Sequence, residues 1–200
     1  SNGLQGQMLI NGSQIDTSLI NNDLPGRLGF DSTLLIESVE TFIINVTAAN
    51  VLIADKKLTG LGSAQWSGGK LTGIAADIFA STNKLSAEVK LGSRIAGLIN
   101  ANAPDLAMLW PGLKGRLESS IILGGSPEQP QVRLTAEAAS VSYGSLSLDT
   151  FTLSGELQGN SRLAGNLDAT GLVADQQQLG KLDLSLAGTL ADHQSSLQLA

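Results

Sequence analysis

Apolar and polar residues alternate along most of the chain, and this two-residue period predicts an all-β protein. In residues 85–91, Leu, Ala, Val and Leu alternate with Ser, Glu and Lys. A strand shows this period when one of its faces is dry and the other is wet. Gly68-Gly69 and Ser81-Thr82-Asn83 lie between neighbouring runs and are typical of tight hairpin turns. We therefore expect a first meander of antiparallel strands over residues 1–92.

Residues 93–112 break the strand rhythm. Ser93 can cap a helix, and Pro104 suits the first turn of one. The apolar residues that follow a helical spacing are Ile95, Leu98 and Ile99. The pattern predicts one or two short helices near 93–110, as an insert between the first meander and a second β stretch.

The second β stretch, residues 113–200, carries a weak internal repeat. The sequence "FTLSGEL" at 151–157 recurs as "LSLAGTL" at 184–190, an offset of 33 residues. Repetition of this kind favours an elongated β architecture in which each unit packs only against its neighbours. Glycine weakens a strand interior, so its recurrence inside the predicted strands favours a sharply curved sheet. These glycines are Gly60, Gly62, Gly73, Gly115, Gly155, Gly165 and Gly188.

Composition and charge narrow the function classes. The chain has 200 residues, of which 42% are hydrophobic and 15% charged, but only four Phe, two Trp and one Tyr. The net charge of −6 and the thin scatter of basic residues argue against nucleic acid as a partner. Cysteine is absent from the sequence, which excludes disulfides and thiolate metal sites.

The sequence contains no apolar run of the ~18 residues that a membrane-spanning helix requires, and its start lacks a charged-then-apolar leader. Strand patterning runs up to both ends. We therefore expect residues 1–200 to be a single fragment of a longer, repeat-like β protein, with any anchor or signal outside it.

Candidate catalytic and metal-binding groups are sparse. His193 is the only histidine, and we interpret it as a solvated turn residue. Asp149, Asp168 and Asp183 alternate with apolar neighbours, which places them on the wet face of strands. The sequence shows no spacing typical of a metal site, so we expect neither catalysis nor a metal or cofactor. For Trp66 we favour a packing role over a ligand platform.

The long Leu, Ile and Val face has two interpretations, because a closed hydrophobic core and an open apolar groove share one alternation pattern. Periodicity alone favours a closed core.

Two longer stretches resemble the TamB family, translocation and assembly module subunits of the Gram-negative envelope. One is "LTGLGSAQWSGGKLTGIAADIFASTNKLSAEVKLG", with a glycine-bearing strand, a tryptophan, a short turn and then N-x-L-x-x-x-x-x-L-G. The other is "LAMLWPGLKGRLESSIILGGSPEQPQVRLTAEAASVSYGSLSLDTFTLSGEL". The resemblance covers roughly residues 51–190, and part of it is shared with other AsmA-like proteins.

The resemblance implies a β-taco, an elongated U-folded antiparallel sheet with a hydrophobic concave interior. It further implies a non-catalytic bridge segment in the periplasm, belonging to a protein anchored in the inner membrane. Such a segment would carry phospholipid acyl chains between the two membranes and support outer-membrane protein assembly with a BamA-like barrel partner of the TamA type. It implies no cofactor.

Strand parity gives the candidate groove-lining residues. They are Leu85, Val89, Leu113, Leu117, Ile121, Leu134, Leu148, Phe151, Leu153, Leu157, Leu184 and Leu186.

Two rival functions stay open. One is a structural or chaperone-like scaffold whose strand edges template outer-membrane or secreted proteins by β-augmentation. The other is a carbohydrate-active β-helix enzyme, which is disfavoured because no acidic cluster with a basic partner is visible.

Overall fold

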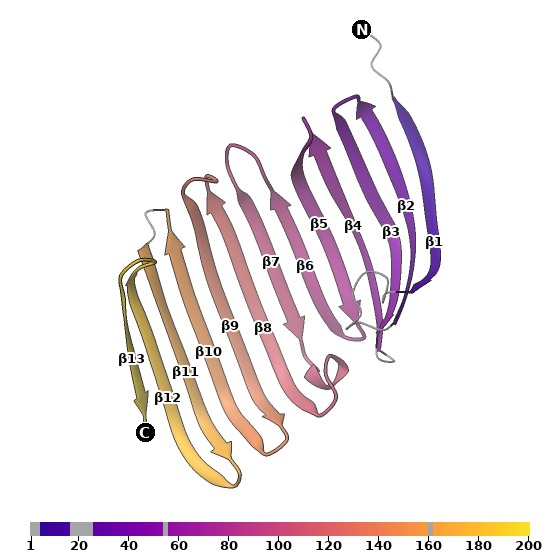
Figure 1. Ribbon diagram of the computed structural model, residues 1–200. Coiled ribbons are helices and arrows are strands. Elements are labelled where there is room, and N and C mark those ends of the chain that lie inside the picture. Colours follow the sequence, from indigo (N-terminus) through magenta and orange to yellow (C-terminus); the bar gives the residue numbers. More distant parts are fainter. Residues whose placement is uncertain (1–4, 17–25, 54–55, 160–161) are drawn as a thin grey trace. The chain divides into compact units, whose positions relative to one another are not determined.

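The computed structural model describes residues 5–16, 26–53, 56–159 and 162–200. Within these ranges the chain forms thirteen β-strands and one short 3₁₀ turn, so the all-β class is confirmed (Figure 1). The chain divides into two compact units, Ser1–Leu91 and Gly92–Ala200. We call them the N-terminal unit and the C-terminal unit and describe each by itself.

The N-terminal unit is a meander of six antiparallel strands, each paired with the next along the chain. The strands are β1 (Gly6–Asp16), β2 (Gly26–Ser38), β3 (Thr41–Ile53), β4 (Lys56–Ser67), β5 (Lys70–Ala80) and β6 (Asn83–Lys90). Gly68 and Gly69 form the β4–β5 turn with φ of 58° and 71°, as their sequence predicts. Positive φ at both central residues is what a type I′ turn requires.

The C-terminal unit is a meander of seven antiparallel strands. They are β7 (Ala96–Ala103), β8 (Leu113–Gly125), β9 (Pro130–Tyr143), β10 (Leu146–Gln158), β11 (Arg162–Ala174), β12 (Gln177–Thr189) and β13 (His193–Leu199). The weak repeat maps onto β10 and β12. Leu153 pairs with Leu167 and Leu167 with Leu184, so the structural offset is 31 residues, not the 33 of the sequence alignment. Because the two offsets differ by two residues, both alignments place the same side chains on the same face of the sheet.

The predicted helical insert at 93–112 is wrong. Residues 96–103 form strand β7, in which Ile99 pairs with Ile121 of β8. The only helical element described there is the single turn η2 (Leu106–Met108), where the Asp105 carboxylate accepts a hydrogen bond of 3.0 Å from the Ala107 amide. A short apolar run fits both the helical period and the strand period. Residues 96–103 become a strand because their backbone pairs with the neighbouring strand β8.

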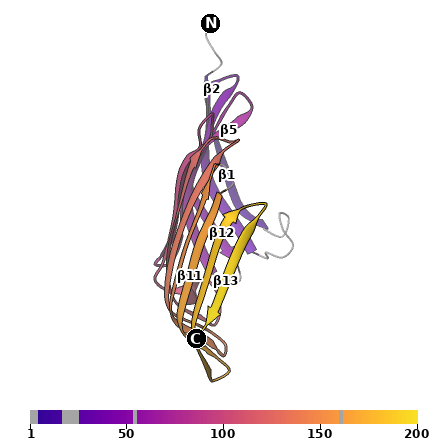
Figure 2. The same ribbon diagram turned by 90° about the vertical axis from the view of Figure 1, so that its left-hand side faces the viewer.

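A line of backbone irregularities crosses the C-terminal unit near one end of its strands. Gly115, Ser140, Gly171 and Gly180, on β8, β9, β11 and β12, have φ of 113°, 53°, 64° and 77°. Asp149 holds the matching place on β10, between the pairs Leu148–Val141 and Thr150–Ala139. Bulges bend a strand and increase its twist. The strands accordingly curve toward this end (Figure 1), and Figure 2 shows β11, β12 and β13 from the side.

Burial is shallow throughout the described residues. The buried apolar residues are small with one exception, Leu106 in η2, and no large side chain is fully buried. The others are Ala80, Ala103, Ala136 and Ala169. Neither unit therefore has an enclosed core of large aliphatic side chains among the residues that the structure describes.

Candidate functional site

One face of the C-terminal unit is aliphatic. Directly paired residues of antiparallel strands point to the same face, so the register defines rows that cross the strands. The row at the middle of this face consists of Ala101, Ser119, Ala136, Leu153, Leu167, Leu184 and Leu197. The next row consists of Ile99, Ile121, Leu134, Gly155, Gly165, Leu186 and Ser195.

Two further rows lie outside these two. One contains Ala103, Leu117, Ala138, Phe151, Ala169, Leu182 and Leu199. The other contains Gly97, Leu123, Val132, Leu157, Leu163, Gly188 and His193. We call the four rows together the apolar face. Asp, Glu, Lys and Arg are absent from these four rows, and His193 lies at their edge on β13.

Exposure shows that the apolar face is open. Its small residues are shielded by larger neighbours, as Ala169 is beside Phe151, and Ala169 is only 2% exposed. Its large residues stay in partial contact with solvent, and exposure rises to 36% at Leu184 and 66% at Leu197. A closed core, which periodicity alone favours, would bury these leucines. The structure instead presents an uncovered aliphatic surface in this unit.

The register places the sequence-predicted residues in three groups. Eight of the twelve lie on the apolar face: Leu117, Ile121, Leu134, Phe151, Leu153, Leu157, Leu184 and Leu186. Leu85 and Val89 belong to the N-terminal unit, where they pair with Ile78 and Ile74. Leu113 and Leu148 pair with Tyr143 and Val141, beyond the line of irregular residues, so they do not belong to the four rows.

Several members of the apolar face escaped the sequence analysis. Leu163, Leu167 and Leu182 follow the same alternation as their neighbours, and the pairing of β11 with β10 would have identified the first two. Ile99 was hidden by the helical prediction for residues 93–112.

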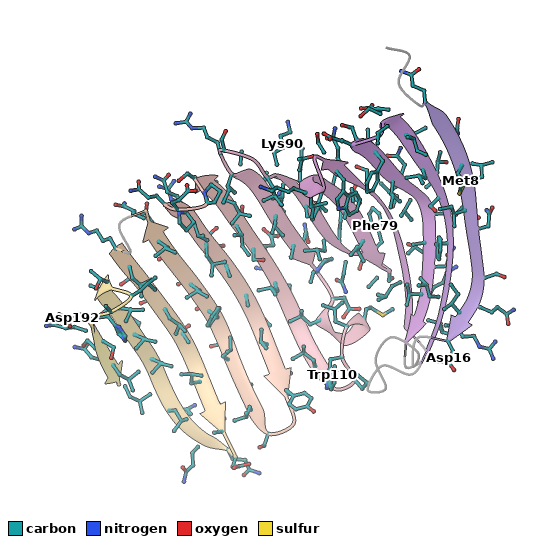
Figure 3. The ribbon with its side chains drawn as sticks, turned by 45° about the horizontal axis from the view of Figure 1, so that its top comes forward. Met8, Asp16, Phe79, Lys90, Trp110 and Asp192 are labelled. Atoms are coloured by element: carbon teal, nitrogen blue, oxygen red, sulfur yellow. The ribbon has the colours of Figure 1, made fainter. Side chains whose placement is uncertain are left out.

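The N-terminal unit has an apolar face of the same kind. One of its rows consists of Met8, which Figure 3 labels on β1, and Leu34, Ile44, Ala64, Ile74 and Val89. The rings of Phe42 and Trp66, which pair across β3 and β4, are stacked with centroids 5.0 Å apart and planes 11° apart. The packing role predicted for Trp66 is confirmed. The buried Ser32 hydroxyl donates to the Ile10 carbonyl at 3.1 Å, which satisfies a polar group among apolar neighbours.

The opposite face of the C-terminal unit is polar. One of its rows holds Asn102, Glu118, Glu137, Thr152, Asp168, Asp183 and Gln198, so two pairs of like charges are direct neighbours. The next row consists of Asn100, Ser120, Thr135, Ser154, Asn166, Ser185 and Ser196. Asp168 and Asp183 therefore lie on the wet face, as the alternation predicts.

Lys181 relieves the repulsion between the two aspartates. Its ammonium nitrogen lies 2.8 Å from Asp183 and 3.8 Å from Asp168. A hydrogen bond shared with Asp183 raises the pKa of Asp168, while the bond from Lys181 lowers the pKa of Asp183. The hydrogen bond to Asp183 also raises the pKa of Lys181. All three side chains are solvent-accessible, so this is a solvated surface cluster.

A second polar contact joins β9 and β10 on the same face. The Arg133 guanidinium lies 3.3 Å from the Glu156 carboxylate, and the Gln158 amide donates to the same oxygen at 3.1 Å. The hydrogen bond from Gln158 and then that from Arg133 hold the pKa of Glu156 below its ordinary value. Both contacts are exposed, which is the setting in which such pairs contribute little to stability.

Groups that carry metal or acid–base chemistry do not converge among the described residues. His193 is the first residue of β13, directly after the turn, and it is exposed. In the described part of the chain, no three His, Cys, Asp or Glu side chains are placed to hold a metal ion. Within those same ranges, none of the helical structure has the length and hydropathy needed to cross a membrane.

The fold and the site together define a class: β-meander proteins built from single-layer units that present an uncovered aliphatic face. The chain matches the family model for the TamB N-terminal domain over residues 1–200, and it therefore belongs to the TamB family. Members of this family are envelope-associated components of the translocation and assembly module, in which they associate with a TamA-type partner. Neither a curated protein nor a solved structure gives a significant match.

Proposed function

We propose that this chain is a periplasmic segment of a TamB-family bridge and that its apolar face holds the acyl chains of phospholipids in transit between the inner and outer membranes. The chain performs no catalysis in this role. By keeping a lipid path open, it supports outer-membrane protein assembly by the module to which the family belongs.

The observation that carries the proposal is the uncovered aliphatic face of the C-terminal unit. Each CH₂ group that leaves water gains ~0.8 kcal/mol, so ten methylene groups laid on this face would gain ~8 kcal/mol at full burial. An extended peptide is a poorer occupant, because its amides would lack hydrogen-bond partners on a surface of leucines.

The dimensions of the face suit an acyl chain. Strands lie ~4.8 Å apart, so the rows that cross the seven strands β7 to β13 run for ~29 Å. The hydrocarbon core of a bilayer is ~30 Å thick and holds two leaflets, so one acyl chain extends ~15 Å. A complete acyl chain therefore fits along a row within this unit.

A pair of adjacent substitutions on β10 tests the proposal. Leu153 lies on the apolar face between Ala136 and Leu167, and Ser154 lies on the polar face between Thr135 and Asn166. Leu153→Asp places a charge among the leucines, whereas Ser154→Asp adds the same charge to a solvated row. Ser154 is a cleaner control than Thr152, whose direct neighbours on the polar face already include two carboxylates.

The measurement is the phospholipid that co-purifies with the chain, quantified per mole of protein by mass spectrometry. We expect Leu153→Asp to lower it more than tenfold and Ser154→Asp to leave it unchanged. Equal effects of the two substitutions would contradict the proposal. A scaffold that acts through its strand edges would tolerate Leu153→Asp and lose function when proline is placed in β13.

A further inference from the structure

The polar face of the C-terminal unit contains a cavity of about 240 Å³ over strands β8, β9 and β10. Two short rows of neighbouring residues border it: Ile122, Arg133 and Glu156, and beside them Gly124, Gln131 and Gln158. Val132 and Leu157 lie between these rows and belong to the apolar face. Because successive side chains of a strand point to opposite faces, the cavity opens on the polar face, with the backbone of Val132 and Leu157 as its floor. We call it the β9 cavity.

The side chains around the β9 cavity keep hydrogen-bonding capacity in reserve. The Oε1 atom of Glu156 accepts from the Arg133 guanidinium at 3.3 Å and from the Gln158 amide at 3.1 Å. Among the residues that the structure describes, the second oxygen of Glu156 accepts no hydrogen bond, and Nε and Nη1 of Arg133 donate none. The Gln131 side chain makes no hydrogen bond to any of those residues either. Free donors and free acceptors therefore border the same cavity.

The charges that line the β9 cavity cancel. Arg133 and Glu156 form one ion pair along its wall, and the two glutamines are neutral. An anionic ligand that approached Arg133 would meet the Glu156 carboxylate, and a cationic ligand that approached Glu156 would meet the guanidinium. The two side chains are 62% and 39% exposed, and an ion pair in this setting contributes little to stability. The electrostatics of the lining therefore favour a neutral ligand.

Ile122 gives the β9 cavity an apolar side. Its side chain is 49% exposed, although it lies on the polar face. Its direct partner on β7 is Leu98, which is 44% exposed and lies on the same face. Exposed aliphatic side chains beside free hydrogen-bonding groups match a ligand that is polar at its edge and apolar on one of its own faces.

We propose that the β9 cavity binds a neutral saccharide, either a free sugar or one ring of a glycan. A sugar hydroxyl donates and accepts at once, so neighbouring hydroxyls accept from Arg133 and donate to Glu156. The C–H face of the ring packs on Ile122, and the Gln131 amide both donates and accepts. The volume lies below the ~300–1,000 Å³ of sites for drug-sized ligands, so the cavity admits one ring at a time. The site lies opposite the apolar face and goes beyond the lipid role proposed above.

Nuclear magnetic resonance of the complete nitrogen-15-labelled chain tests the proposal by titration with glucose and with maltotetraose. We expect both sugars to shift the side-chain amide signals of Gln131 and Gln158, with dissociation constants in the millimolar range. Similar constants for the two assign the site to a free or terminal ring, and much tighter binding of maltotetraose assigns it to a glycan. Phosphate, lysine and a capped alanine tetrapeptide are the comparison ligands, and none of them should shift these signals.

Arg133→Met with Glu156→Met removes both charges together and leaves unbranched apolar side chains. We expect this double variant to bind glucose about tenfold more weakly, which corresponds to ~1.4 kcal/mol. The matched control is Lys181→Met with Asp183→Met, which removes a 2.8 Å ion pair of the same face outside the cavity and should change binding less than twofold. Circular dichroism checks that each variant is folded. If the first double variant does not fold, Gln131→Leu replaces it, because it breaks no hydrogen bond within the described ranges, and it should weaken binding about threefold.

The outcomes are independent of the proposed lipid role. Leu153→Asp, which should lose phospholipid, should keep glucose binding, since Leu153 lies on the other face. Absence of shifts with both sugars, or an equal loss in the control variant, would overturn the saccharide site while lipid binding stands. Stronger shifts with phosphate, lysine or the peptide would overturn it in favour of a charged or a peptide ligand. Sugar binding that weakens in the Arg133 and Glu156 variant and persists in the control supports the site.

Discussion

Alanine substitutions at two glycines of the C-terminal unit, one on β8 and one on β10, should change its stability in opposite directions. Gly115 lies in the line of irregular residues on β8, and Gly155 lies in a row of the apolar face on β10. Both occur inside strands, and composition alone would treat them alike. We expect Gly115→Ala to destabilise the C-terminal unit and Gly155→Ala to stabilise it slightly.

The magnitudes follow from the backbone. At Gly115, φ is 113°, and a Cβ would lie 2.8 Å from both the Ser140 carbonyl oxygen and the Val141 Cα. A non-glycine residue in such a conformation costs about 1–3 kcal/mol, and the contacts with β9 add to this, so we expect a loss of at least ~2 kcal/mol. At Gly155 the Cβ meets open space, and alanine reduces the freedom of the unfolded chain, which stabilises by about 0.4–1 kcal/mol.

Urea denaturation followed by circular dichroism measures the difference. With an m value of ~2 kcal/mol/M, Gly115→Ala should lower the midpoint by ~1 M, and Gly155→Ala should raise it by about 0.2–0.5 M. Because the chain has two compact units, hydrogen exchange resolved by peptide should confirm that the change lies in β8 to β12.

Equal destabilisation by the two substitutions would refute the reasoning, since it would mean that Gly155 is as constrained as Gly115. An unchanged urea midpoint for Gly115→Ala would also refute the reasoning, because the backbone at the line of irregular residues would then not require glycine.

Substitutions at two other sites probe electrostatics and ring packing. The pKa of Asp168 is raised in the folded chain, so the folded chain binds this proton more tightly than the unfolded chain does. Protonation of Asp168 therefore stabilises the fold at low pH, and this stabilisation is lost as the pH rises through the raised pKa. Asp168→Asn should therefore equal or exceed the unsubstituted chain in urea midpoint at pH 7, with the gap closing toward pH 4; a lower midpoint at pH 7 would contradict this. Trp66→Ala removes the stack on Phe42 and should cost the N-terminal unit ~2 kcal/mol by urea denaturation, whereas Trp66→Phe keeps a stack and should cost less than half as much.

Strand alternation and turn chemistry were enough to predict most of the fold. The Gly68-Gly69 turn and the runs of β8 to β12 lie where the sequence places them, because both signals are local. The β7 prediction failed because the signal there is not local. Residues 96–103 become a strand when β8 supplies backbone hydrogen bonds along its whole length, and a single sequence does not show that partner.

The candidate site was predictable in its middle and not at its ends. Between two backbone irregularities, the alternation of odd and even positions gives the face on which a side chain lies, as it does for Leu153 and Leu157. It cannot carry an assignment across them, and for this reason Leu113 and Leu148 fall outside the four rows. The pairing of Gly155 with Gly165 was also beyond reach, because it depends on the register between β10 and β11, which a single sequence does not show.

The central claim is that lipid contacts the apolar face, and photo-crosslinking in cells tests it most directly. A photoactivatable amino acid is placed at Leu153 or, as the control, at Ser154, and the adducts are analysed for lipid and protein. The account predicts phospholipid adducts at Leu153 and none at Ser154. Protein adducts without lipid at Leu153, or equal lipid labelling at both positions, would contradict it.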